Sequence, residues 1–81
     1  MQILYFSWLR ERVGEASEDI ETSAATPADL ILELKAKSEG YASAFADISA
    51  IRVAVDQQMV ELDHPLTGAK EVAFFPPMTG G

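Results

Sequence analysis

The last eight residues of the chain carry the most distinctive chemical pattern in the sequence. The segment from Phe74 to Gly81 reads FFPPMTGG. Its two prolines fix φ and stiffen the base of the segment toward an extended polyproline conformation, so the segment projects in a defined direction. Its two glycines lack a Cβ, so they can pass along a narrow channel and leave the terminal carboxylate open to attack. The pattern predicts chemistry at the main-chain carboxylate of Gly81, with a frayed and inert terminus as the alternative.

A carboxylate is a poor electrophile and must be activated before a nucleophile attacks it. Adenylation by ATP is the usual biochemical route, so we expect a separate ATP-using enzyme to act on Gly81. The residues expected to follow a channel in a partner protein are Pro76, Pro77, Met78, Thr79 and Gly80.

Composition excludes several other kinds of chemistry. The 81 residues include 6 Lys or Arg, 13 Asp or Glu, one His and no Cys, which gives a net charge of −7. Without Cys there is no disulfide, no thiolate nucleophile and no Cys-ligated metal, and one His cannot complete a zinc site. An acidic balance argues against nucleic acid and favours partners with basic surfaces.

The length allows one small domain. The apolar run from Met1 to Leu9 is far shorter than the roughly 20 residues that span a bilayer. Its charges follow the apolar stretch, whereas those of a signal peptide precede it. We therefore expect a cytoplasmic protein without membrane contact.

The first half of the chain predicts two strands and a helix. Gln2 to Leu9 is rich in apolar and aromatic residues and predicts a strand, and the polar segment Glu15 to Ser23 predicts a weak edge strand anchored by Ile20. Thr26 is a good N-cap with Pro27 at the first helical position, and Gly40 is placed to end the helix. The segment from Tyr41 to Asp47 predicts one further short helical turn.

The second half predicts the remaining strands. Arg52 to Asp56 alternates with two valines on one side, Gln57-Gln58 turns the chain, and Val60 and Leu62 continue the inward parity. After a turn from His64 to Gly68, Glu71 to Phe75 predicts the last strand. The order of elements predicts an α+β fold with one sheet and one main helix across its face.

Some apolar residues of the predicted strands share a parity that faces away from the helix. Phe75 shares its parity with Glu71, and Met59 shares its parity with Glu61, which marks both as facing solvent. Together with the outward parity of the first strand they predict an apolar partner surface. Its predicted members are Leu4, Phe6, Trp8, Met59 and Phe75. The alternative is that Phe75 and Met59 are core or isolated surface residues.

Other polar residues favour structural roles. His64 beside Asp63 predicts a turn, because Pro65 restricts His64 to extended geometry and no nucleophile is paired with it. Arg10 and Arg12 predict a solvated turn, with contact to a partner or to a nucleotide phosphate as the alternative. The acidic residues Glu15, Glu18, Asp19 and Glu21 predict a solvated edge that discourages strand addition.

Several motifs resemble those of the small, sulfur-carrier subunits of molybdopterin synthase. They are Leu9-Arg10-Glu11, Val13-Gly14, Asp63 to Thr67, Glu71 to Pro77, and Thr79-Gly80-Gly81. Departures are Met78 before Thr-Gly-Gly and the turn sequence Gly68-Ala69-Lys70. The resemblance implies a ubiquitin-like β-grasp domain over residues 1–75, with a mixed four- to five-stranded sheet, and a projecting tail over residues 76–81.

The resemblance also implies a mechanism and partners. Gly81 would be adenylated by a ubiquitin-activating-like enzyme, which uses ATP and Mg, and converted to a thiocarboxylate by a sulfur donor. The tail would enter the large synthase subunit and deliver sulfur to cyclic pyranopterin monophosphate, and two deliveries would make the molybdopterin dithiolene. The small subunit would bind no cofactor itself and would form a heterotetramer of two small and two large subunits.

Two other uses of the same activated terminus remain open. One is a protein modifier that forms isopeptide bonds to lysines, and the other is a sulfur carrier for thiamine-thiazole synthesis. The Phe74-Phe75-Pro76-Pro77 segment speaks against the second.

Overall fold

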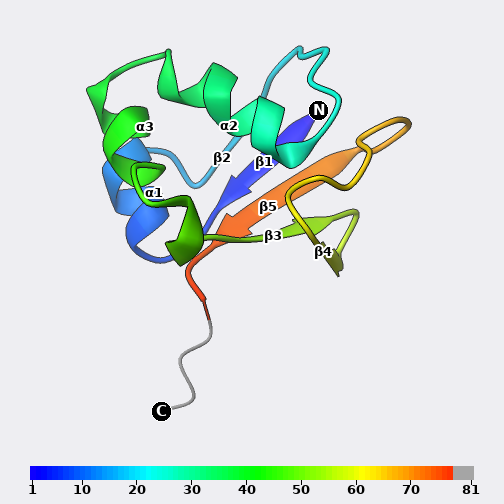
Figure 1. The fold of residues 1–81 in the computed structure, drawn as a ribbon. Helices are drawn as coiled ribbons and strands as arrows, with labels where there is room; N and C mark the ends of the chain where they lie inside the picture. The colour runs from blue at the N-terminus through cyan, green and yellow to red at the C-terminus, as the bar shows by residue number, and fades with distance from the viewer. Residues whose placement is uncertain (78–81) are drawn as a thin grey trace.

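A computed structural model describes residues 1–77, which form one mixed five-stranded sheet (Figure 1). The strand order is β2-β1-β5-β3-β4, and only the central pair of β1 and β5 is parallel. The strands are β1 (Gln2–Tyr5), β2 (Ser17–Asp19), β3 (Arg52–Val55), β4 (Gln58–Val60) and β5 (Glu71–Phe75). The predicted last strand is therefore confirmed, and it lies in the middle of the sheet.

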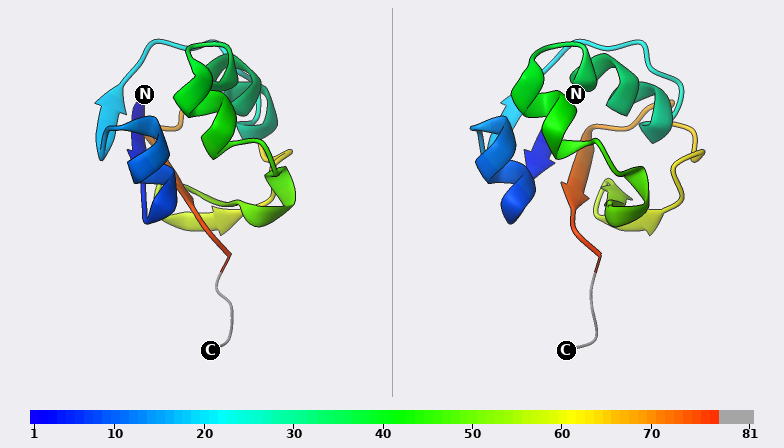
Figure 2. Two further views of the ribbon diagram at one scale, coloured as in Figure 1. Left: turned by 90° about the vertical axis from the view of Figure 1, so that its left-hand side faces the viewer. Right: turned by 60° about the vertical axis from the view of Figure 1, so that its left-hand side comes forward.

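Three short α-helices and a 3₁₀ turn connect the strands. They lie on one side of the sheet (Figure 2). They are α1 (Trp8–Val13), α2 (Pro27–Lys35), α3 (Glu39–Ala44) and η1 (Ile48–Ala50). The predicted start of the main helix is confirmed, because the Thr26 hydroxyl accepts a 3.2 Å hydrogen bond from the Asp29 N–H. Within residues 1–77 no helix has the length and apolar character needed to cross a membrane.

The main helix ends earlier than the sequence predicts. It stops at Lys35, and Gly40 lies inside α3, so the prediction that Gly40 ends the main helix is wrong. A Cβ on Gly40 would lie 2.6 Å from the carbonyl oxygen of Arg12. The glycine therefore allows α3 to approach the backbone of α1. The predicted short helix after residue 40 is confirmed by α3, which begins slightly earlier.

The core lies between the sheet and the helices. Tyr5, Phe45 and Phe74 are the largest fully buried side chains, and the rings of Phe45 and Phe74 meet edge to face with centroids 5.0 Å apart. Aliphatic side chains from the sheet and the helices surround them. Those that are fully inaccessible to solvent are Ile3, Leu9, Leu30, Ile31, Leu34 and Val72.

The prediction of one strand from Gln2 to Leu9 is wrong beyond Tyr5. Ser7 has a φ of 55°, which ends the extended run, and α1 begins at the next residue. Leu9 is fully buried, whereas residues 10–12 are exposed. The apolar run fits a strand or the start of an amphipathic helix, and burial of Leu9 favours the helix. Trp8 accordingly belongs to a helix and packs against the core.

The hairpin turn between β3 and β4 lies one residue earlier than predicted. Asp56 and Gln57 have φ values of 49° and 70°, and Gln58 is the first residue of β4. Two consecutive positive φ values match the two-residue turns that suit the twist of a hairpin. The Asp56 carboxylate also accepts hydrogen bonds from the N–H groups of Lys70 and Glu71, at 2.9 and 3.0 Å, and so fixes the start of β5.

The acidic edge strand is confirmed as β2, but Glu18 is not a solvated edge residue. Its carboxylate accepts hydrogen bonds from the hydroxyls of Tyr5 and Tyr41 and from the Lys37 ammonium. The Glu18 side chain is 17% exposed. The prediction is wrong here because Glu18 lies opposite Ile3 in the register and points toward the helix side of the sheet. Asp19, by contrast, is exposed and pairs with the N-terminal amine.

Candidate functional site

The predicted reactive segment begins at the end of a central strand. β5 pairs with β1 on one side and with β3 on the other, so the backbone that carries the tail is held along both edges. Pro76 and Pro77 follow β5 and leave the sheet on the side away from the helices (Figure 2). The predicted site residues Met78, Thr79, Gly80 and Gly81 lie outside the described residues.

Close to the end of β5, the side of the sheet opposite the helices is apolar. Leu4, Ala73, Ala54 and Met59 form a row across four strands, since each is the register partner of the next. Ala54 and Ala73 are nearly buried yet do not belong to the core cluster, which confirms that they face the other way. We call this surface the open face, and its members are Leu4, Phe6, Ala54, Met59, Ala73 and Phe75.

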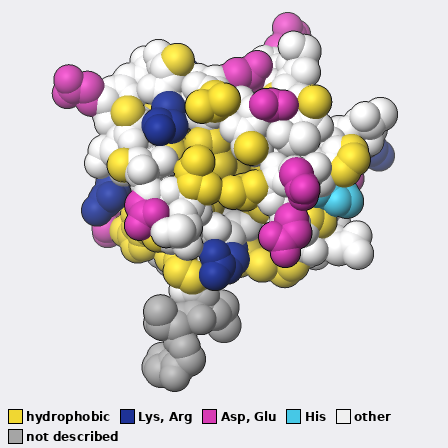
Figure 3. Space-filling model, in the orientation of Figure 1, with side chains coloured by type: hydrophobic (Ala, Val, Ile, Leu, Met, Phe, Trp, Pro, Cys, Tyr) yellow, Lys and Arg dark blue, Asp and Glu magenta, His cyan; other side chains and the backbone are white. Residues whose placement is uncertain are grey.

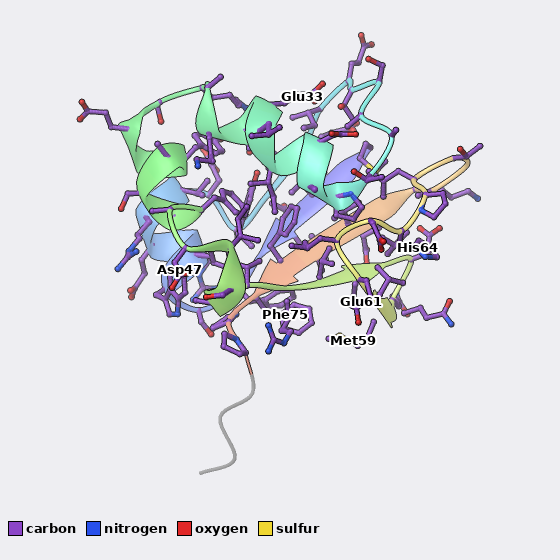
Figure 4. All side chains as sticks on the ribbon, viewed as in Figure 1. Glu33, Asp47, Met59, Glu61, His64 and Phe75 are labelled. Atoms are coloured by element: carbon purple, nitrogen blue, oxygen red, sulfur yellow. The ribbon has the colours of Figure 1, made fainter. Side chains whose placement is uncertain are left out.

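Leu4 and Met59 flank the two small alanines in this row. Met59 is 57% exposed and Phe6 is 46% exposed, whereas Phe75 is only half-buried rather than exposed as predicted. The reason is that the Phe75 ring meets the Phe6 ring edge to face, with centroids 6.3 Å apart. Figure 4 shows Phe75 and Met59 on the side of the sheet away from the helices. An exposed apolar surface of this kind is typical of a partner interface.

Two other predicted members of the site lie on α1. Trp8 is half-buried in the helix and is not part of the open face, because the strand ends before it. Arg10 is exposed on the same helix, which is not the turn that the sequence predicts. Arg12 is engaged within the domain: its guanidinium lies 4.8 Å from the centre of the Trp8 ring and donates a 3.3 Å hydrogen bond to the Ser43 carbonyl.

The segment around His64 has the predicted turn structure. The His64 N–H donates a 3.1 Å hydrogen bond to the Glu61 carbonyl, and the side chain is exposed. Leu66 anchors the loop in the core, and its N–H donates to the Ala25 carbonyl just before α2. Among residues 1–77 no group of three His, Asp or Glu side chains could hold a metal ion.

Arg52 also belongs to this region, although it is not among the residues predicted for the site. It begins β3 and is the register partner of Phe75, so it lies where the tail starts. Its Nη1 donates hydrogen bonds to the carbonyls of Ile51 and Ser49, at 3.2 and 3.4 Å. The signal was present in the sequence, because Arg52 shares the outward parity of Ala54 and flanks the two inward valines.

Comparisons with known proteins agree with this geometry. The ThiS family model matches residues 3–81. The chain is 40% identical, over its full length and 99% of the relative, to the molybdopterin synthase sulfur carrier subunit of Escherichia coli. Among solved structures, a molybdopterin converting factor subunit 1 from Pyrococcus furiosus has a TM-score of 0.73 and 29% identity, with 95% of each chain covered.

A further similarity concerns the fold alone. The crystal structure of SAMP1 from Haloferax volcanii has a TM-score of 0.72 at 23% identity and covers 100% of this chain and 98% of its own. The predicted ubiquitin-like β-grasp fold is thus confirmed, with a five-stranded mixed sheet. Sequence and fold together show that the chain belongs to the ThiS family.

Proposed function

We propose that the chain is the sulfur-carrier subunit of a molybdopterin synthase. The observation that carries the proposal is the full-length 40% identity to the Escherichia coli subunit of that name. The family match also extends through Thr79, Gly80 and Gly81. The geometry supports it, since the described part of the tail starts from a central strand beside an exposed apolar surface.

In the proposed reaction the carboxylate of Gly81 is activated in a partner enzyme. One carboxylate oxygen attacks the α-phosphorus of ATP, pyrophosphate leaves, and an acyl adenylate forms. A sulfur nucleophile from a donor system then attacks the acyl carbon and displaces AMP, so one oxygen of the carboxylate is replaced by sulfur. The thiocarboxylate transfers that sulfur to cyclic pyranopterin monophosphate, water hydrolyses the acyl–sulfur bond so that Gly81 becomes a carboxylate again, and two transfers complete the dithiolene of molybdopterin.

This chain contributes position rather than catalysis in the proposal. β5 and the two prolines direct the tail, and the open face binds the large catalytic subunit, in an assembly of two small and two large subunits. The activating enzyme binds the chain at a different step. The chain binds neither a metal nor a cofactor of its own, and ATP and Mg belong to the activating enzyme. The proposal includes a cytoplasmic location, where ATP is available, and no contact with nucleic acid or membrane.

Intact-mass spectrometry tests the proposal directly. The full chain is incubated with ATP, an activating enzyme of this class and a sulfur donor, and we expect one oxygen to be exchanged for sulfur at Gly81. Deletion of Gly81 is the matched control and should abolish the exchange. An unchanged mass under conditions that convert the Escherichia coli subunit would contradict the proposal.

The competing fates of the terminus give different products. Gly81 joined to lysine side chains of other proteins would identify a protein modifier. Transfer of sulfur into a thiazole, with none into the pterin, would identify a carrier for thiamine synthesis.

A further inference from the structure

A groove with both apolar and polar lining lies at the end of the sheet formed by β3 and β4, next to the open face. It has a volume of about 750 Å³. Its walls come from η1, from the start of β3, and from β4 with the two residues that follow it. The lining residues are Ile48, Ser49, Ile51, Arg52, Val53, Met59, Val60, Glu61 and Leu62.

The groove presents apolar surface to solvent. Ile48 is 38% exposed and Met59 is 57% exposed, and Val60 and Leu62 are half-buried. Figure 3 shows hydrophobic side chains gathered at the centre of this side of the molecule, with acidic side chains to their right. In the same orientation Figure 4 places Met59 and Glu61 at the β4 end of the sheet. Within residues 1–77, no helix or strand covers these side chains.

Arg52 gives the groove a fixed positive charge. Two carbonyl oxygens hold Nη1 of Arg52 at 3.2 and 3.4 Å, which orients the guanidinium against η1. No carboxylate of residues 1–77 forms an ion pair with it. A planar guanidinium that is already oriented binds a carboxylate with little further loss of side-chain freedom. In a chain with a net charge of −7, this cation marks where an acidic partner group can be accepted.

The groove is continuous with the surface from which the tail leaves. Met59 belongs to both the groove and the open face. Arg52 lines the groove and is also the register partner of Phe75, at the root of the tail. A protein that covers the open face while it receives the tail therefore reaches the groove as well.

We propose that this groove is a second contact site for the large subunit that receives the tail. It takes an apolar segment of that subunit, and Arg52 binds an aspartate or glutamate of that segment. Glu61 on the groove wall disfavours an acid at that end, so the partner carboxylate is directed to Arg52. This inference rests on the proposed function. The sequence predicts partners with basic surfaces. In this proposal that prediction does not extend to the partner surface at the root of the tail, which is apolar with an acidic residue.

The charge is tested with variants of Arg52 in the full chain. Isothermal titration with the purified large subunit is carried out at low and at high salt. We expect Arg52→Glu to weaken binding by at least about tenfold at low salt, because attraction is replaced by repulsion, and Arg52→Lys to lose less. Lys70→Glu makes the same change of charge at the other end of β5 and should leave binding unchanged. Replacing the contacting Asp or Glu of the large subunit by Lys should restore its binding to the Arg52→Glu variant.

The apolar part is tested with a matched pair of leucine-sized side chains. Ile48→Gln changes the groove, whereas Leu32→Gln changes a side chain on α2 that is 63% exposed and does not line it. We expect several-fold weaker binding for the first variant and no change for the second. Thermal melts check that each variant is folded.

The outcomes separate this inference from the proposed function. If Arg52→Glu and Ile48→Gln bind like the unchanged chain while Phe75→Ala binds weakly, the groove proposal is overturned and the proposed function stands. If Gly81 also fails to gain sulfur, the proposed function fails. A dimer of the chain alone that Arg52→Glu dissociates would show that a second copy occupies the groove, which also overturns the inference.

Discussion

The hydroxyl of Tyr5 donates a 2.8 Å hydrogen bond to Oε2 of Glu18, from the middle of the sheet to its acidic edge. The same carboxylate accepts hydrogen bonds from the Tyr41 hydroxyl at 2.7 Å and from the Lys37 ammonium at 2.8 Å. One side chain of β2 thus connects β1, α3 and the segment before α3. This cluster satisfies two phenol groups that the core leaves at its boundary.

Removal of this acceptor should destabilise the domain. Glu18→Ala leaves the hydroxyls of Tyr5 and Tyr41 without their partner, and we expect a loss of about 2 kcal/mol in the free energy of unfolding. Urea denaturation followed by circular dichroism measures it. Glu15→Ala changes an exposed acid before the same strand and should have almost no effect. Equal stability of the two variants would show that the cluster adds nothing.

The same cluster predicts a dependence of stability on pH. Burial alone would raise the pKa of Glu18, but hydrogen bonds from Lys37, Tyr41 and Tyr5 outweigh it and hold the pKa below its usual value. A lowered folded-state pKa gives stability that is present above the unfolded-state pKa of about 4.3 and is lost as pH falls through the folded-state pKa.

Glu18→Gln removes the ionised carboxylate, so a comparison with the unchanged chain measures its contribution to stability. At pH 7 the unchanged chain should be the more stable of the two, and the difference in unfolding free energy should shrink steadily as the pH falls below about 4.3. Urea denaturation at a series of pH values checks this. A difference that stays constant down to pH values near 2 would contradict the assignment.

Local patterns of sequence predicted much of the fold. The two-residue alternation around Val53 and around Val72 and Phe74 identified buried faces, because that period is a property of any strand. The cap at Thr26 is likewise local. Glu18 was misassigned because its partner Tyr41 lies 23 residues away, and only the packed tertiary structure brings the two together.

Gly40 offers a test of the packing between α1 and α3. Gly40→Ala places a Cβ 2.6 Å from the Arg12 carbonyl oxygen, so backbone must shift. The substitution should cost about 1–3 kcal/mol of unfolding free energy, even though alanine favours helices by about 1 kcal/mol relative to glycine. Thermal unfolding measures the change, with the exposed Ser43→Ala in the same helix as control. Stabilisation by Gly40→Ala would show that the helices separate freely.

In the hairpin between β3 and β4, by contrast, a substitution is expected to stabilise the domain. Gln57 has a φ of 70°, which costs energy for any residue with a Cβ, so Gln57→Gly should stabilise the domain by about 0.5–1 kcal/mol. Gln58→Gly makes the same change one residue later, inside β4, and should destabilise it. Melting temperatures of the two variants check the contrast. The same sign for both would show that the turn conformation does not limit stability.

The site was predictable to a smaller extent than the fold. Parity identified Met59 and Phe75 on the outer face, because it needs only the register of each strand. Parity gave the wrong position for Trp8, because β1 ends at Tyr5 and Trp8 is the first residue of α1. Parity places Arg52 on the outer face as well, but its position beside Phe75 follows from the pairing of β3 with β5, which joins residues more than 20 positions apart.

The open face should contribute to binding of the partner and little to folding. Phe75→Ala removes a half-buried ring that packs on Phe6, so we expect a loss of stability of about 1 kcal/mol. Met59→Gln changes an exposed side chain and should leave stability unchanged. Both should weaken binding to the large subunit by about tenfold or more, because an interface loses most from truncation of its apolar anchors.

Titration calorimetry and urea denaturation on the same preparations separate the two effects. Full affinity in Met59→Gln would place the interface elsewhere on the domain. The matched change Leu32→Gln on the helix side should alter neither quantity, since that side chain is remote from the row that crosses the sheet.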